Sequence, residues 1–348
     1  MILKPEQKPS NPYFSSGPCS KRPGWNSDIY SKAIIGRSHR SKIALSRIKE
    51  VIDLTKLLLE IPDNFYVGIV PASDTGAIEM LLWSLLGEKP LEVLAWESFG
   101  NDWVKDIVDQ LKVPNTKVTQ AKYGKIVNLN NVNFKKDIVF TWNGTTSGVC
   151  VPNGDWIPDN REGLTICDAT SAAFSMRLPW KKLDATTFSW QKVLGGEAQH
   201  GIIVLSPKTI HRLENFIPNR AIPKIFQLSN RGKVNEKLFT GSTINTPSML
   251  CVEDALDALN WVKQVGGIEK TIELSRKNLL IVEKKIKHSL WLDFLPEEKS
   301  IRSCTSICLK IKESVLEKYE TDKLKEKMNN LFSFLEENRI AYDINSYR

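Results

Sequence analysis

The sequence lacks a long apolar run and has little of the chemistry that marks metal or disulfide proteins. None of its apolar runs approaches the ~20 residues of a membrane helix, and its opening stretch, MILKPEQKPSNPYF, has no apolar segment typical of a secretory signal. It has only four histidines, and no two cysteines form a CxxC pair. We therefore expect no membrane partner, no disulfide framework, no metal site and a cytoplasmic location. The six cysteines are Cys19, Cys150, Cys167, Cys251, Cys304 and Cys308.

Two nucleotide-binding patterns are also missing, because neither GxxxxGK[ST] nor GxGxxG occurs. The formal net charge is +8, but lysines and arginines are spread over all 348 residues without a dense basic block between aromatics. Nucleic acid is therefore not expected as a partner. Anionic small molecules fit a basic balance of this kind.

The order of the hydropathy patterns predicts an α/β domain followed by a smaller α+β domain. Residues 1–25 are rich in Pro, Ser and Gly and are expected to form an extended N-terminal arm. From 26 to 247, short β-rich runs alternate with helical patterns, which favours a mostly parallel sheet that binds ligands at the carboxyl ends of its strands. From 248 to 348, long amphipathic helices dominate and only short strands remain.

The individual elements are predicted from apolar spacing and β propensity. The predicted strands of the first domain are 65–70, 91–96, 137–142, 164–170, 185–190 and 201–206, and its helices include 42–60, 75–86 and 99–111. The second domain is predicted to hold helices 248–265, 268–289 and 315–338 and short strands near 304–311 and 341–344.

An aspartate and a lysine stand at the ends of two consecutive predicted strands. Asp168 closes the run LTICD, and Lys192 follows the next strand in FSWQKVLGG. Neighbouring strands of one sheet would bring the two side chains together. Pyridoxal-phosphate (PLP) chemistry needs such a pair, because a lysine amine forms the Schiff base and a carboxylate keeps the pyridine nitrogen protonated. Taken singly, a surface lysine and a turn aspartate are ordinary, but few charges surround Lys192.

Three further segments offer contacts for an anion or a planar ring. The turn PASDTGA places Ser73, Asp74 and Thr75 at a helix start, where N–H groups and the helix dipole favour an anion. Phe99 follows another strand end and can stack on a ring. GRSHRSK, residues 36–42, gathers three cations and a histidine suited to phosphate or carboxylate. An ordinary helix cap, a core aromatic and a solvated charge run are the alternative explanations.

In this order the segments resemble those of the fold-type I PLP aminotransferases, and most closely the phosphoserine aminotransferase family of the class V group. The resemblance spans nearly the whole chain and implies a large α/β/α domain with a mostly parallel sheet and a smaller C-terminal α+β domain. It also implies reversible amino transfer between O-phospho-L-serine and 2-oxoglutarate in serine biosynthesis. Some relatives also accept a phosphorylated hydroxythreonine of vitamin B6 (pyridoxine) synthesis. The most specific stretches are FSSGPCSKRPGW, GRSHRSK, PASDTGAIEM, ESFGNDW, WNGTTSGV, CDATSAAF, FSWQKVLGG and NTPS.

The resemblance implies a role for each matching residue. Lys192 is the catalytic Schiff-base lysine, and Asp168 is the partner of the pyridine nitrogen. Phe99 stacks on the cofactor ring and Thr145 bonds its O3′ oxygen. The cofactor phosphate is held by Ser73, Asp74, Thr75 and Gln191, and by Asn245 and Thr246 from a neighbouring subunit, which implies a homodimer. His39 and Arg40 match the pair that binds the phosphate of the substrate.

One departure from the family concerns the substrate carboxylate. In that family a further strand follows the position of Arg348 and carries an arginine that binds this group, whereas this sequence ends at SYR. A shortened chain, another ligand such as Arg348 or Arg302, and impaired activity are the open explanations. The rival functions are an alanine– or serine–glyoxylate aminotransferase, which needs no phosphate-binding pair, and a catalytically impaired PLP-fold binding protein. A cysteine desulfurase is disfavoured because no segment stands out as a mobile cysteine loop.

Overall fold

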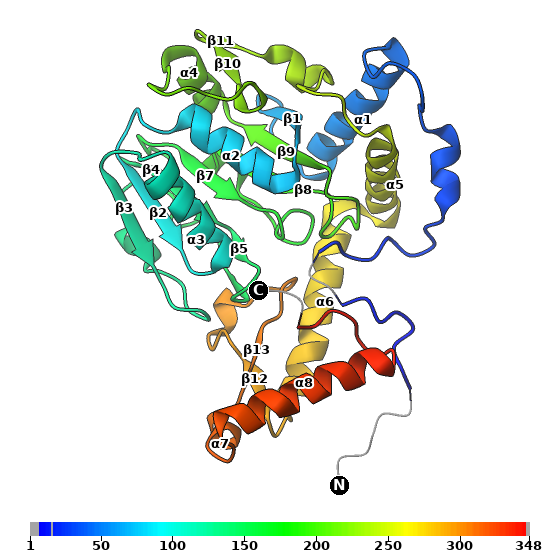
Figure 1. Cartoon of the computed structure of the whole chain (residues 1–348). Helices are drawn as coiled ribbons and strands as arrows, with labels where there is room; N and C mark the ends of the chain where they lie inside the picture. Colours follow the sequence, from blue (N-terminus) through cyan, green and yellow to red (C-terminus); the bar gives the residue numbers. More distant parts are fainter. Residues whose placement is uncertain (1–6, 15–16, 346–348) are drawn as a thin grey trace.

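The computed structural model describes residues 7–14 and 17–345 and centres on a seven-stranded sheet (Figure 1). The strand order is β1-β9-β8-β7-β4-β2-β3; β9 runs antiparallel to β1 and β8, and all other neighbouring pairs are parallel. The predicted α/β fold with a mostly parallel sheet is thereby confirmed. The strands are β1 (Tyr66–Pro71), β2 (Leu91–Ala95), β3 (Thr116–Gln120), β4 (Asp137–Thr141), β7 (Thr165–Asp168), β8 (Ala185–Ser189) and β9 (His200–Leu205).

Helices cover both faces of this sheet, because alternate side chains of each strand enter one of two apolar cores. Cys167 and Phe188 point into the core that α1 and α5 cover, whereas Ile166 and Ala185 point into the core formed with α2, α3 and α4. The helices are α1 (Lys42–Leu58), α2 (Ser73–Leu85), α3 (Ser98–Lys105), α4 (Pro207–Asn215) and α5 (Met249–Val265).

A second group of elements lies below the sheet in Figure 1 and is joined to it by the long helix α6. It contains an antiparallel pair of short strands and two further helices. Its elements are α6 (Gly267–Lys287), β12 (Leu292–Phe294), β13 (Leu309–Ile311), α7 (Glu313–Leu316) and α8 (Thr321–Glu337). The domain boundaries at 25 and 247 stay predictions. None of the helices in the described part of the chain is long and apolar enough to cross a membrane.

Two predicted elements of this second group are wrong. The helix predicted over 315–338 is two helices, α7 and α8, and Glu320 precedes α8 in an extended conformation. The strand predicted at 341–344 is a single bridge between Tyr342 and Tyr13. Asp343 has a φ of 59°, a left-handed conformation that ends the extended chain there.

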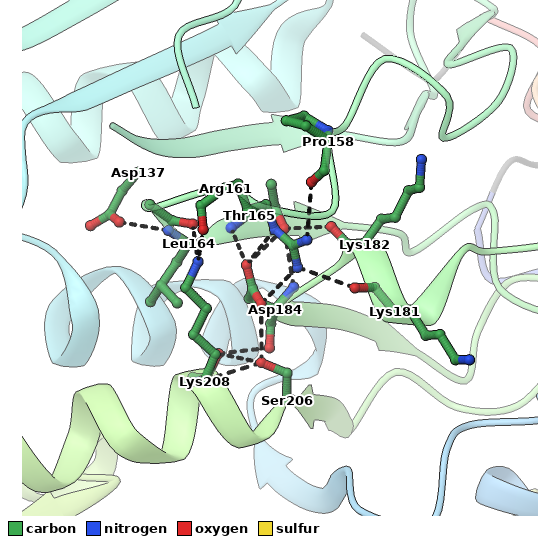
Figure 2. A network of polar contacts seen from close by, with 12 residues as sticks. Asp137, Pro158, Arg161, Leu164, Thr165, Lys181, Lys182, Asp184, Ser206 and Lys208 are labelled. Carbon is green, nitrogen blue, oxygen red and sulfur yellow. Dashed lines mark hydrogen bonds and ion pairs between the residues drawn. The ribbon is translucent and has the colours of Figure 1, made fainter. Parts of the chain in front are cut away.

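A buried polar network fixes the edge of the sheet opposite to the carboxyl ends of its parallel strands (Figure 2). Asp184, just before β8, accepts two hydrogen bonds from Arg161 at 2.8 and 2.9 Å. It also accepts one from the backbone N–H of Thr165 at the start of β7 and one from the hydroxyl of Ser206 after β9. One carboxylate therefore joins three neighbouring strands and sets their relative position.

Candidate active site

The ends of β7 and β8 bring Asp168 and Lys192 into one cavity of about 200 Å3. Asp168 is the last residue of β7 and pairs with Thr141 in β4 and Thr187 in β8. Lys192 follows β8 within a tight turn, where its carbonyl accepts the N–H of Gly195 at 2.9 Å. Both side chains are buried, with exposed fractions of 5% and 8%. The arrangement is the one that the strand order predicts.

The cavity collects side chains from the ends of several strands and from two helix starts. Eight of the residues predicted to bind cofactor line it, namely Ser73, Asp74, Thr75, Phe99, Thr145, Asp168, Gln191 and Lys192. The other lining residues are Gly17, Pro18, Trp103, Thr141, Asn143, Thr170, Ser171 and Ala198.

Two N–H groups hold the carboxylate of Asp168 in a fixed orientation. Its Oδ1 accepts the backbone N–H of Thr170 at 3.0 Å, and its Oδ2 accepts the indole N–H of Trp103 at 3.1 Å. The carboxylate is the acceptor in both bonds, because an N–H group can donate but cannot accept. Trp103 was not among the predicted site residues. The segment ESFGNDW contains it one helical turn after Phe99, and that spacing is the signal that could have revealed it.

The turn from β1 into α2 has an unusual backbone. Ala72 and Ser73 have φ values of 65° and 56°, a left-handed conformation that non-glycine residues rarely adopt and that often marks a functional site. A side chain at Gly76 would lie 2.3 Å from the carbonyl oxygen of Pro71, so only glycine allows this tight turn. The first turn of α2 therefore points N–H groups without intrahelical acceptors toward the cavity, as an anion site requires.

The side chain of Asp74 is an exception at this anion site, because it is a carboxyl group. It is 6% exposed, and its Oδ1 atom is buried without a hydrogen-bond partner among the described residues. Burial raises the pKa of Asp74 well above its usual range, and the charge of Asp168 raises it further.

The start of α3 places Phe99 on the cavity wall. Glu97 caps this helix by accepting the N–H of Gly100 at 2.5 Å, and it also accepts the hydroxyl of Thr146 at 3.1 Å. The cap thus ties Phe99 to the loop that carries Thr145. Burial raises the pKa of the fully buried Glu97 carboxyl, and the N–H groups of Gly100 and Phe99 oppose the shift.

The N-terminal arm closes the cavity beside the lysine. The N–H of Cys19 donates to the carbonyl of Gln191 at 2.7 Å and fixes the arm against the Lys192 turn. A Cβ atom at Gly17 would lie 2.6 Å from the Nζ atom of Lys192, so a larger residue here would displace the amine. Burial raises the pKa of the Cys19 thiol, although the charge of Lys192 opposes this shift.

The lining residues fit a flat, polar cofactor with a phosphate. Five buried atoms of the lining have no hydrogen-bond partner among the described residues, namely Asp74 Oδ1, Thr141 Oγ1, Asn143 Oδ1, Thr170 Oγ1 and Gln191 Oε1. Buried polar groups normally have partners, so these atoms indicate a bound molecule or water. A carboxylate for a ring nitrogen, an aromatic side chain for stacking and helix N–H groups for a phosphate surround the same cavity as Lys192. This set of groups matches PLP.

Four predicted residues lie outside the cavity of their own chain. Arg40, Asn245 and Thr246 are exposed and His39 is half-buried, and the described lining includes none of them. They stand in the loops before α1 and α5.

The structure describes only one of the two arginines considered for binding the substrate carboxylate. The guanidinium of Arg302 donates to Glu283 and to the carbonyls of Pro296 and Glu297, each at 3.0 Å, so it serves the second group of elements. Arg348 lies outside the described residues.

Known proteins resemble this chain closely in sequence and in fold. No family model matches the chain. A phosphoserine aminotransferase of Methanosarcina mazei is 52% identical over 346 residues, which cover 99% of this chain and 91% of the relative. A phosphoserine aminotransferase structure from Cytophaga hutchinsonii has a TM-score of 0.75 at 22% identity over 84% of this chain and 82% of that one. A PLP-bound phosphoserine aminotransferase structure from Trichomonas vaginalis has a TM-score of 0.75 at 17% identity over 95% and 91%.

The sheet topology, the cavity and the similarity to the 52% identical relative together define a fold-type I, PLP-dependent aminotransferase. The 52% identity to the Methanosarcina mazei relative over nearly the full length narrows this class to one family. The chain belongs to the phosphoserine aminotransferase family.

Proposed function

We propose that this chain transfers an amino group reversibly between O-phospho-L-serine and 2-oxoglutarate and gives 3-phosphohydroxypyruvate and glutamate. The observation that carries the proposal is the cavity in which Lys192 and Asp168 meet, in a chain of this family. In the direction that forms phosphoserine, the reaction serves serine biosynthesis. All six cysteines are free thiols, which agrees with a cytoplasmic location.

Lys192 carries the chemistry that we propose. When bound, PLP supplies an electron sink for the carbanion that forms at Cα of an amino acid. The Nζ atom of Lys192 would hold the cofactor covalently until substrate binds, and the released amine would then move the Cα proton as a general base. The carboxylate of Asp168 would hold a proton on the ring nitrogen. Two substrates that use one cavity in turn imply ping-pong kinetics.

The remaining lining residues bind and orient the cofactor. The side chain of Phe99 would stack on the ring, and the hydroxyl of Thr145 would bond its O3′ oxygen. The N–H groups of residues 73–75, the hydroxyls of Ser73 and Thr75 and the amide of Gln191 would hold the phosphate.

The homodimer belongs to the proposal because four residues lie outside the cavity of their own chain. We infer that Asn245 and Thr246 complete the cofactor-phosphate site of the partner. His39 and Arg40 then bind the phosphate of the substrate, and the guanidinium group suits a dianion because it donates two parallel hydrogen bonds. The exposed positions of Arg40, Asn245 and Thr246 on a single chain agree with contacts made across an interface.

A coupled assay with phosphoserine and 2-oxoglutarate tests the proposal. We expect glutamate-forming turnover that Lys192→Ala abolishes, together with loss of the visible absorbance of the bound cofactor. A Lys192→Ala protein that retains both would contradict the assignment of this residue.

Substitution of Arg40 separates the proposed reaction from its nearest rival. We expect Arg40→Ala to raise the KM for phosphoserine, because the charge-assisted hydrogen bonds of its guanidinium group to the phosphate are lost. A glyoxylate aminotransferase would use alanine or serine instead, and its turnover would hardly respond to this change. Turnover with alanine and glyoxylate that exceeds turnover with phosphoserine would favour the rival.

A further inference from the structure

One buried carboxylate of α5 binds residues 17–25 of the N-terminal arm at two points. The Nζ atom of Lys21 lies 2.6 Å from Oδ2 of Asp254, and the indole N–H of Trp25 donates to Oδ1 of the same side chain at 3.2 Å. The ammonium group of Lys21 also lies 5.7 Å from the centre of the Trp25 ring, within the range of a cation–π contact. Both oxygens of Asp254 therefore bind groups of the arm.

Asp254 is a buried charge whose cation comes from the arm. Its exposed fraction is 2%, and it faces the turn that follows Lys192, since a Cβ atom at Gly196 would lie 3.5 Å from its Oδ2. A buried carboxylate is strongly unfavourable unless a cation and hydrogen-bond donors compensate it. Lys21 supplies the cation, and the other carboxylate that Lys21 binds, Glu197, is 54% exposed. Undocking of the arm would therefore leave Asp254 without the cation that compensates its charge in the docked structure.

The arm that Asp254 holds runs along the side chain of Lys192. A Cβ atom at Gly17 would lie 2.6, 3.3 and 3.6 Å from the Nζ, Cε and Cδ atoms of this lysine. Gly17 and Pro18 line the cavity, and the N–H of Cys19 donates to the carbonyl of Gln191 at 2.7 Å. The docked arm therefore limits where the amine of Lys192 can move.

A second ion pair holds the arm less firmly. The guanidinium of Arg22 donates two hydrogen bonds of 2.7 Å to Asp257, and the two side chains are 20% and 18% exposed. Because solvent reaches this pair, its net contribution is smaller than that of a fully buried pair. It would still retain part of the arm when Asp254 is changed, so we expect a partial release of the arm.

We propose that Asp254 is a positioning residue, because its carboxylate holds the arm through Lys21 and Trp25, and the arm in turn keeps the amine of Lys192 directed into the cavity. The described lining of the cavity does not include Asp254, so this residue acts through the arm and not on the cofactor itself. The docked arm also covers the amine on this side of the cavity, which slows the departure of bound PLP. The inference rests on the proposed role of Lys192 and not on the identity of the amino-acid substrate.

The rate at which PLP leaves the holoprotein tests the role of Asp254. We would incubate each PLP-loaded protein with a phosphatase that destroys free PLP, and measure the PLP that stays bound after rapid gel filtration. Asp254→Asn and Lys21→Met should release PLP about fivefold or more faster than the wild type, because each removes the buried charge pair. Glu197→Gln is the matched control, since it removes only the exposed partner of the same lysine, and its rate should stay within about twofold.

A conservative variant shows whether the charge of the arm is what matters. Lys21→Arg keeps the positive charge, so its release rate should also stay within about twofold of the wild type. Wild-type release rates in both Asp254→Asn and Lys21→Met would overturn the proposal. A Lys21→Arg protein that releases PLP as fast as Lys21→Met would overturn it as well.

Cleavage by trypsin after Lys21 shows whether the arm itself is released. Asp254→Asn should be cleaved there about fivefold or more faster than the wild type and Glu197→Gln, because local release of the arm exposes its backbone. Faster cleavage of Asp254→Asn together with wild-type PLP release would show that the arm does not position Lys192, and would also overturn the proposal. Neither measurement involves phosphoserine or a keto acid, so a failure here is distinct from a failure of the proposed reaction, which the coupled assay detects.

Discussion

At the scale of single residues, the site depends on how Asp168 is oriented. The sequence predicts the aspartate itself, because it ends a buried strand, but it does not predict the donors that hold it. Trp103 reaches Asp168 from a helix that lies 65 positions earlier in the chain. A contact of this kind depends on how α3 packs on the sheet, and that packing is not visible in local spacing.

Trp103→Phe tests this contact. The phenyl ring retains most of the packing but loses the indole N–H, and a hydrogen bond to a charged group contributes about 1.5–3 kcal/mol. We expect PLP to bind about tenfold more weakly in a titration of the apoprotein.

Trp156→Phe is the matched control, because its buried indole N–H has no partner within the described part of the chain. Its affinity for PLP should stay within about twofold of the wild type. A Trp103→Phe protein that binds PLP as tightly as this control would show that the indole does not support Asp168.

At the scale of elements, the buried strands are the part that the sequence predicts well. The runs predicted at 91–96 and 137–142 differ from β2 and β4 by one residue at their ends, because both strands are buried on both faces and are mostly apolar. The edge strand β3, TKVTQ, was not predicted, since its exposed side chains are mostly polar. The break between α7 and α8 was missed because the helical spacing continues across it.

A substitution in the network around Asp184 tests how the strands that carry the site are held in place. Asp184→Ala would leave the buried guanidinium of Arg161 without its carboxylate, and breaking a buried ion pair costs about 3–5 kcal/mol. We expect the midpoint of urea unfolding to fall accordingly. Asp159→Ala, at an exposed position close to Arg161 in sequence, should leave it unchanged. Equal midpoints for the two variants would contradict the proposed role of the network.

At the scale of the whole molecule, we propose that the site is complete only in a homodimer. Eight predicted residues line the cavity of their own chain, whereas the loops with His39, Arg40, Asn245 and Thr246 face outward. Only the family resemblance suggested that these loops contribute to the site of a partner. No local sequence pattern distinguishes a loop that lines the cavity of its own chain from a loop that lines the cavity of a partner.

Mixing two inactive variants tests whether each site takes residues from both subunits. Lys192→Ala lacks the amine, and the double variant Asn245→Ala, Thr246→Ala lacks the groups that we assign to the partner's site. In a mixed dimer, the double variant supplies Lys192 and receives intact loops from its partner, which restores one site. Equal mixing followed by subunit exchange should recover about a quarter of wild-type turnover. No recovery, with mixed dimers verified by mass, would show that each chain completes its own site.

The central claim is that the PLP held by Lys192 accepts an amino group from phosphoserine. The measurement that tests it most directly mixes the purified PLP-bound protein with O-phospho-L-serine in the absence of any keto acid, and counts the 3-phosphohydroxypyruvate released. We predict one equivalent per bound PLP, followed by a stop that 2-oxoglutarate relieves. If no 3-phosphohydroxypyruvate is released, or if inorganic phosphate is released in its place, the account is contradicted.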